Sequence, residues 1–286
     1  MNSGNDRKRP NSRRNLDFAL QRLQGPGARL VQARMAMANA IVGQMLKDVV
    51  IKGGTSLRMR YGREASRYTV DCDVSMRTGP DEFAEGLRAA LAEGWNGFSG
   101  ELATKRPARP KNVPPEYVMR PFEVKLSYLG RSWCTVPLDA GFDELGQADE
   151  PEMRPVAEDI AELFVALGFP VPGPLPLMPL ALQVAQKLHG VSAPRSDRAR
   201  DLIDLQLVMA NDPVDLAETG RICERLFKYR KLQKWPPVVA KGESWDGLYD
   251  AQKGKLGVLP DADAAVAWAN ELVARIVAAT SNGDGA

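Results

Sequence analysis

The stretch Arg67-Tyr-Thr-Val-Asp-Cys-Asp-Val-Ser-Met76 decides how this chain is interpreted. Side chains alternate between the two faces of a β-strand, so Asp71 and Asp73 would share one face and the apolar residues the other. Two carboxylates so close together repel each other, and a divalent cation such as Mg²⁺ between them relieves the repulsion. The stretch therefore predicts a strand with a metal-binding face. The apolar face would carry Tyr68, Val70, Cys72, Val74 and Met76.

The aspartate pair also fits an ordinary exposed sheet face, and taken alone it favours that interpretation. The preceding residues change the balance. Residues 49–51 predict a short buried strand that runs into Lys52-Gly53-Gly54-Thr55-Ser56, with a helix expected from Leu57. Glycines let the backbone approach a ligand closely, and free N–H groups at a helix N-terminus bind phosphate. A phosphate-binding turn followed by paired carboxylates is the combination that phosphoryl transfer needs.

A third carboxylate, Asp139, lies in another predicted strand, residues 132–142. Val136 and Leu138 alternate with Asp139, so its side chain points away from the apolar face. Three acids on neighbouring strands can hold two metal ions and orient an attacking hydroxyl. On the strand pattern alone, an ordinary strand-end aspartate is an equally good interpretation.

The second half of the chain adds two candidates on predicted helices. Lys187 lies one turn after Gln183 on the flank of an apolar stripe. Asp201 and Asp204 are three residues apart and share a helix face. The apolar neighbours of Asp204 predict partial burial, and a buried carboxylate needs a partner. The local pattern favours a structural salt bridge from Lys187 or Arg200 to Asp204.

The predicted architecture is α+β, with an all-helical second half. Three domains are expected: a disordered basic tail (1–14), a catalytic domain (15–150) and a helical domain (151–286). A further strand, residues 117–129, should pair antiparallel with residues 132–142, and residues 170–179 predict a rigid linker. The predicted helices cover 16–46, broken at Gly25-Pro26-Gly27, and 81–91, 156–167, 177–190, 198–209, 214–229 and 262–279.

Composition sets broader limits. In 286 residues with a net charge of +2, 44% are hydrophobic, which excludes a wholly disordered chain. No apolar run is long enough to cross a bilayer, and the polar N-terminus does not match a signal peptide. Three widely spaced cysteines argue against a disulfide framework. These features predict a reduced, cytoplasmic protein.

Five motifs together resemble those of the AbiEii/AbiGii nucleotidyltransferase toxins, a type IV toxin–antitoxin group that includes the mycobacterial MenT toxins. The resemblance implies a polymerase-β-like domain followed by a helical domain, with Mg²⁺ as cofactor and an NTP as substrate. It also implies tRNA or another RNA as acceptor and a possible cognate antitoxin. The motifs are residues 51–57, 67–73, 138–142, 185–189 and 198–205.

Carried onto this sequence, the resemblance assigns three groups of site residues. It favours a functional role for Lys187 and Asp204 over the salt bridge, as phosphate contact and as the acid that completes the site. It gives metal binding to Asp71, Asp73 and Asp139. The nucleotide would be held by Lys52, Gly53, Gly54, Thr55, Ser56 and Arg67. No role is assigned to Asp143, Asp201 or His189.

The sequence thus predicts a toxin-like enzyme that transfers a nucleotide from an NTP to an RNA 3′-hydroxyl, with tRNA as first candidate, and so blocks translation. One alternative is a nucleotidyltransferase that modifies a protein or a small molecule. Another is a non-catalytic nucleotide-sensing or RNA-binding protein. Residues 227–235 interleave basic and aromatic side chains, which fits a nucleic-acid surface and equally the solvated face of a helix.

Overall fold

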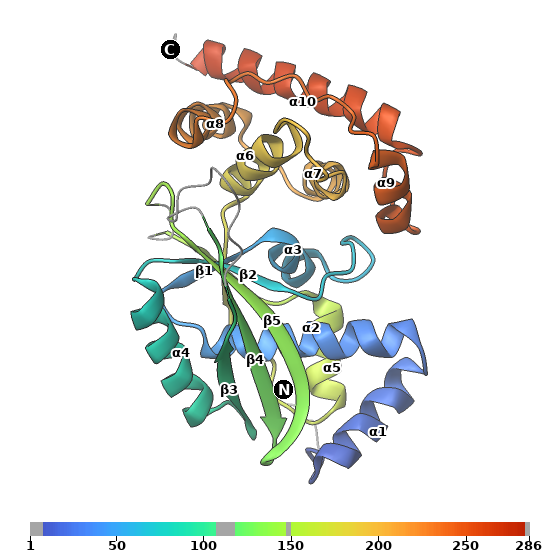
Figure 1. The fold of residues 1–286 in the computed structure, drawn as a ribbon. Coiled ribbons are helices and arrows are strands. Elements are labelled where there is room, and N and C mark those ends of the chain that lie inside the picture. Colours follow the sequence, from blue (N-terminus) through green and yellow to red (C-terminus); the bar gives the residue numbers. More distant parts are fainter. Residues whose placement is uncertain (1–7, 107–117, 147–149, 284–286) are drawn as a thin grey trace. The chain divides into compact units, whose positions relative to one another are not determined.

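The computed structural model describes residues 8–106, 118–146 and 150–283 (Figure 1). The chain forms two compact units. The first contains Met1–Gly62 and Tyr68–Leu177, and the second contains Arg63–Arg67 and Met178–Ala286. The predicted boundary at residue 150 therefore lies too early, because the residues just after it still belong to the sheet of the first unit.

A seven-stranded sheet in the order β3-β4-β5-β2-β1-β7-β6 forms the centre of the first unit. β2 pairs in parallel with β5 and antiparallel with β1, which in turn pairs in parallel with β7. The predicted antiparallel pairing of β4 and β5 is confirmed. The strands are β1 (Val49–Lys52), β2 (Cys72–Met76), β3 (Phe98–Thr104), β4 (Arg120–Tyr128), β5 (Arg131–Phe142), β6 (Glu152–Arg154) and β7 (Leu175–Leu177).

The predicted strand 67–76 is shorter than expected. β2 begins only at Cys72, and Tyr68 and Val70, expected on the buried face, are 39% and 41% exposed. On one side, β1 ends at Lys52 opposite Asp73 because α3 (Gly53–Tyr61) begins at the next residue, and Cys72 is in β2 only through its pairing with Leu138 of β5. No β1 residue remains to pair with the segment before Cys72.

Four more helices complete the described part of the first unit: α1 (Arg13–Gln24), α2 (Ala28–Met45), α4 (Pro80–Glu93) and α5 (Glu158–Ala166). The predicted break between α1 and α2 is confirmed, and Gly25 and Gly27 adopt positive φ there.

The prediction of a disordered tail over 1–14 is wrong for its last part. The Ser12 hydroxyl caps α1 by accepting a hydrogen bond from the backbone N–H of Asn15. The Pro10 carbonyl accepts one from the Tyr128 hydroxyl. Residues 1–7 lie outside the described residues.

The described part of the second unit is helical, as predicted. However, the expectation of helices alone after residue 150 is wrong, because β6 and β7 follow it and the predicted 170–179 linker contains β7. Each of these strands has three residues, and β7 includes Pro176, so neither carries a clear periodic signal. Among the described helices, none is long and apolar enough to span a membrane. The helices of this unit are α6 (Leu180–Val191), α7 (Arg200–Asn211), α8 (Leu216–Arg230), α9 (Trp245–Lys253), which was not predicted, and α10 (Ala262–Gly283).

His189, the only histidine, is buried at the end of α6. Its ring packs edge-on against Phe227 with the centroids 4.7 Å apart, and its Nδ1 lies 3.2 Å from Nη1 of Arg230. Burial first, and then the charges of Arg230 and Arg198, lower the pKa of His189 to about 3. His189 is therefore neutral and has a structural role in this unit.

The low pKa of His189 makes stability depend on pH. Between about pH 6.5 and 3 the unfolded chain binds a proton at this residue and the folded chain does not, so stability is lost as the pH falls through this window. We expect the free energy of unfolding of His189→Phe to fall less than that of the wild type over the same range. Chemical denaturation at a series of pH values measures this, and parallel curves for the two proteins would contradict it.

Candidate active site

Three polar residues form a row across the centre of the sheet. Lys52 on β1 is directly opposite Asp73 on β2, and Asp73 is directly opposite Asp139 on β5. Residues opposite each other on neighbouring strands point to the same face. The structure therefore brings Asp73 and Asp139 together, and it adds Lys52 from the strand on the other side.

Asp71 lies just before β2 and is held by two threonines. The Thr69 hydroxyl donates to Asp71 Oδ1 at 2.6 Å, and the Thr55 hydroxyl donates to the Asp71 carbonyl oxygen. Both threonines are buried. The sequence placed Thr55 against the nucleotide, but its hydroxyl fixes the backbone of the acid segment instead. Any contact from Thr55 to a ligand would come from its backbone.

The carboxylate of Asp73 lies against the first turn of α3. Gly53 has φ +66°, and a Cβ added there would lie 2.2 Å from Asp73 Oδ2. Only glycine fits this position. The sequence placed the helix start at Leu57, four residues late, and Ser56 is consequently inside the helix with its side chain fully buried. Lys52 and Gly53 are the partly exposed residues of the predicted phosphate-binding turn.

The electrostatic field around Asp139 is mixed. Burial and then the negative charge of Asp71 raise the pKa of Asp139, while Lys105 and Lys52 act in the opposite direction. A Cβ on Gly141 would lie 3.0 Å from Lys52 Nζ, so this ammonium group extends over β5. Sequence reasoning missed Lys105, because only the pairing of β3 with β4 brings it near the acids.

The acids suit a hard divalent cation that arrives with its substrate. Within residues 8–106, 118–146 and 150–283, no three His, Cys, Asp or Glu side chains form a ready metal cluster. Mg²⁺ does not need one, since it is commonly held by one or two carboxylates together with substrate phosphates. Asp71 and Asp73 could supply such a pair, and Asp139 lies opposite Asp73 on the neighbouring strand as a further carboxylate.

A separate charged cluster is buried in the second unit. Lys187 Nζ donates to Asp204 Oδ2 at 2.5 Å and to Asp201 Oδ1 at 3.0 Å, and all three side chains are at most 4% exposed. Arg67 Nε donates to Asp204 Oδ1 at 2.9 Å, and Arg198 Nε donates to Asp201 Oδ2 at 2.6 Å. Each carboxylate is thus shared by two cations.

This cluster realises the salt bridge between Lys187 and Asp204 that the local sequence pattern favoured. Arg200, the other predicted partner, is exposed, and the sequence gave no role to Asp201. Burial alone would raise the pKa of Asp201, but Lys187 and Arg198 outweigh it and hold the pKa well below its usual value. Asp201 therefore stays ionised and completes the burial of the Lys187 ammonium.

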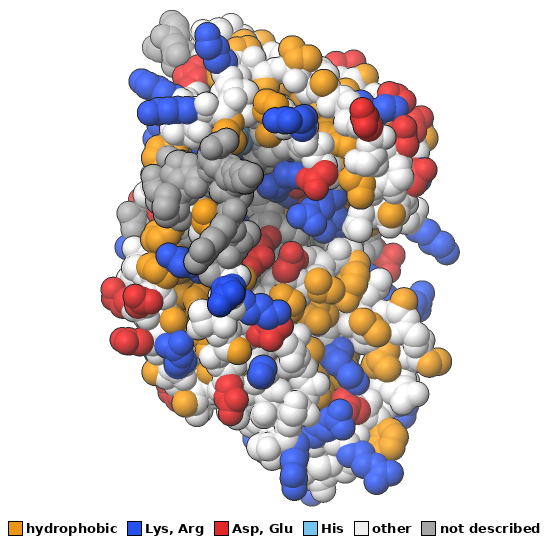
Figure 2. All heavy atoms as spheres, in the orientation of Figure 1, with side chains coloured by type: hydrophobic (Ala, Val, Ile, Leu, Met, Phe, Trp, Pro, Cys, Tyr) orange, Lys and Arg blue, Asp and Glu red, His pale blue; other side chains and the backbone are white. Residues whose placement is uncertain are grey.

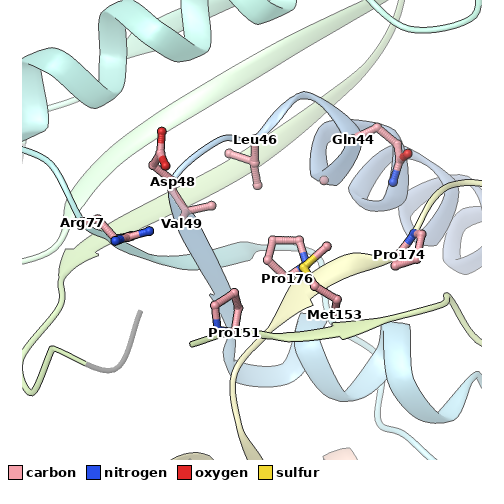
Figure 3. Close-up of a pocket in the computed structure, with 10 residues that line it drawn as sticks. Gln44, Leu46, Asp48, Val49, Arg77, Pro151, Met153, Pro174 and Pro176 are labelled. Carbon is pink, nitrogen blue, oxygen red and sulfur yellow. The ribbon is translucent and has the colours of Figure 1, made fainter. Parts of the chain in front are cut away.

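A pocket of the first unit lies elsewhere. It measures about 320 Å³ and opens at the Val49 end of β1, whereas the acids lie at the Lys52 end (Figure 3). None of the predicted site residues lines it. The chemistry suggested by the acids therefore does not take place in this pocket. Its lining includes Gln44, Asp48, Arg77, Pro151, Met153 and Pro176.

Comparison with known proteins bears on this geometry. Residues 37–273 match the family described as "Nucleotidyl transferase AbiEii toxin, Type IV TA system". No curated protein matches the chain. Among solved structures, the nucleotidyltransferase toxin MenT4 from Mycobacterium tuberculosis matches with a TM-score of 0.60 and 20% sequence identity, over 93% of this chain and 89% of that one.

Two structures from Helicobacter pylori are also similar. JHP933 has a TM-score of 0.43 and 15% identity over 87% of this chain and 92% of its own. A putative nucleotidyltransferase has a TM-score of 0.44 and 14% identity over 90% and 98%. The MenT4 likeness, together with the sheet and the C-terminal helices, confirms the predicted fold class.

Replacing Gly53 tests the fit of Asp73 against α3. In Gly53→Ala, the added Cβ would displace the Asp73 carboxylate, and misplacing a reacting group by about 1 Å costs about 100-fold in rate. We expect nucleotide transfer to fall about 100-fold while the circular dichroism spectrum is retained. Gly86→Ala on α4 is the matched control, because its Cβ would meet nothing within 4 Å. Equal activity of the two variants would contradict the proposed geometry.

Removing the shared cation tests the buried cluster. Lys187→Met leaves two buried carboxylates short of one partner each, which typically destabilises a protein by about 3–5 kcal/mol. The exposed Lys255→Met serves as control, with an expected change below about 0.5 kcal/mol. Urea denaturation measures both changes. A near-neutral Lys187→Met would show that the cluster does not stabilise the second unit.

Proposed function

Because the chain belongs to the AbiEii nucleotidyltransferase toxin family, we propose that it transfers a nucleotide from an NTP to the 3′-hydroxyl of an RNA, with tRNA as first candidate. The family itself supports transferase activity, a nucleotide substrate and a cognate antitoxin. The RNA acceptor, the requirement for Mg²⁺ and the block of translation are part of the proposal.

One observation carries the proposal. The Asp73 side chain shares a sheet face with Asp139 of the neighbouring strand, and its carboxylate also lies against the N-terminal turn of α3. Free N–H groups at a helix start attract phosphate, and paired carboxylates attract the cation that accompanies it. A nucleoside triphosphate with its metal is the ligand that offers both charges together.

The proposed reaction joins the RNA 3′-oxygen to the α-phosphorus and releases pyrophosphate. Asp71 and Asp73 would hold Mg²⁺, which when bound stabilises charge at the attacking and leaving oxygens. Asp139, whose pKa is raised by burial and by Asp71, would accept the proton of the hydroxyl. Lys52 would neutralise charge on the triphosphate beside Asp73.

Lys187 and Asp204 enter the proposal as positioning residues. Lys187 is enclosed by two carboxylates, and Asp204 binds Arg67, which precedes Asp71 by four residues in the chain. The buried contacts support a role in which Asp204 holds the Arg67 end of this peptide. They support direct contact of Lys187 or Arg67 with the nucleotide less well, because both side chains are already bonded within the second unit.

The alternative functions differ from the proposal in the acceptor of the nucleotide or in the absence of turnover. Transfer to a protein or to a small-molecule hydroxyl would use the same acids, and a non-catalytic nucleotide sensor would bind NTP without releasing pyrophosphate. The pair of carboxylates beside a helix start supports turnover, because repulsion between such acids serves no purpose in a sensor.

The test uses the purified full chain with bulk tRNA, Mg²⁺ and each labelled NTP. We expect label in the RNA with wild type, and at least a 1,000-fold loss with Asp73→Asn, because the substitution removes a metal-binding charge, a loss of about 4 kcal/mol or more. Asp81→Asn, an exposed acid on α4, is the control for the loss of one charge. Equal labelling by wild type and Asp73→Asn would overturn the site, and label in protein rather than RNA would replace the acceptor.

A further inference from the structure

Exposed cations collect at the C-terminal end of α8 and in the turn that follows it. We call this the α8 basic surface, and define it as Arg225, Lys228, Lys231 and Lys234. Lys and Arg side chains also gather beside α8 in the space-filling view (Figure 2). The segment holds a single acid, Glu224, so its net charge is strongly positive within a unit that is otherwise mixed.

The cations of this surface differ from many others of the same unit in lacking acidic partners. Among the described residues, no carboxylate pairs with any of the four defining residues. Arg221, by contrast, pairs with Glu218, Lys241 pairs with Asp246 and Asp263, and Lys253 pairs with Asp250. Four unpaired cations close together repel one another, and an external polyanion would relieve that repulsion.

The turn after α8 is fixed by hydrogen bonds to the end of α6 and by an aromatic contact with α8. Gln233 Nε2 donates to the His189 carbonyl at 2.8 Å and to Ser192 Oγ at 2.9 Å. The Trp235 ring packs against Phe227 with centroids 5.3 Å apart. The surface is therefore preorganised, and little conformational entropy is lost when a ligand binds.

A second basic segment lies close by. Arg230 Nη1 lies 3.2 Å from His189 Nδ1, and a Cβ on Gly190 would lie 2.8 Å from Arg198 Nε, so both guanidinium groups lie near the end of α6. The segment around Arg198 also contains the exposed Arg195 and Arg200. Cations from two separate parts of the chain thus lie near the end of α6, although Arg198 is paired with Asp201.

Apolar side chains are exposed among the cations. Tyr229 is 39% and Leu232 63% exposed. The preference for cations at a helix C-terminus accounts for Lys228 and Arg230, but it accounts neither for Lys234 beyond the helix nor for an exposed aromatic ring. Cations that track a backbone, interleaved with rings on which bases stack, are the combination that single-stranded nucleic acid recognises.

We infer that the α8 basic surface binds the sugar–phosphate backbone of the acceptor RNA, with a base stacked on Tyr229. The inference rests on the proposed transfer to RNA and deepens it, because it assigns acceptor recognition to the second unit. Nucleotide recognition stays with the sheet of the first unit. The two functions can therefore be impaired separately.

The experiment compares two doubly substituted full-length chains that change charge by the same amount. Lys228→Glu/Lys234→Glu alters the surface, and Lys255→Glu/Arg275→Glu alters exposed cations in the turn after α9 and on α10 as the matched control. Fluorescence anisotropy with a short 5′-labelled single-stranded RNA measures binding over a range of salt. Transfer of labelled nucleotide gives the KM for RNA and the KM for NTP separately.

With the surface variant we expect at least tenfold weaker RNA binding, a salt slope smaller by about 1.4, and a higher KM for RNA with the KM for NTP unchanged. Tyr229→Ser should weaken binding with little change in the salt slope. Unchanged RNA binding, or an equal loss in the control chain, would overturn the inference. So would weaker RNA binding with an unaltered KM for RNA.

The two proposals fail in different ways. If the wild type binds the RNA through the α8 basic surface but labels no RNA, the proposed acceptor is wrong and the surface has another polyanionic ligand, which overturns the inference as stated. If it labels RNA and the surface variant labels RNA equally well at limiting RNA, the transfer proposal stands and the surface assignment falls.

Discussion

The parallel pairing of β2 with β5 is the constraint on which the candidate site depends. It sets Asp73 directly beside Asp139, and the antiparallel pairing with β1 adds Lys52 on the other side. A one-residue slip in either pairing would turn these side chains to the opposite face of the sheet. The buried face of β2, with Cys72, Val74 and Met76 in the core, opposes such a slip.

Close packing then fixes what the register has brought together. The absence of a side chain at Gly53 lets the Asp73 carboxylate lie against the first turn of α3. Two buried threonine hydroxyls hold Asp71 from its side chain and its backbone. Neighbouring carboxylates repel one another, which destabilises the folded protein. The hydrogen bonds from the threonines and the close packing at Gly53 offset part of this repulsion.

In the second unit, charged side chains are buried and paired with one another. Lys187 is buried with two carboxylates, each of which also binds an arginine. Complete pairing makes such a cluster tolerable in the interior, where an unpaired charge would be costly. The four cations of the α8 basic surface are the opposite case, since they are exposed and lack acidic partners among the described residues. One unit thus contains both a neutralised interior and a charged surface.

The sequence by itself determined the long helices, the α+β order, the faces of β5 and the need of Asp204 for a cationic partner, because periodicity and burial of apolar residues act locally. Tertiary structure decided the rest. The segment before Cys72 has no partner in β1, the short β6 and β7 exist only through pairing with neighbours, and the charge of Lys105 acts on Asp139 only because β3 pairs with β4. Such features depend on partners far away in the chain, and no local pattern encodes them.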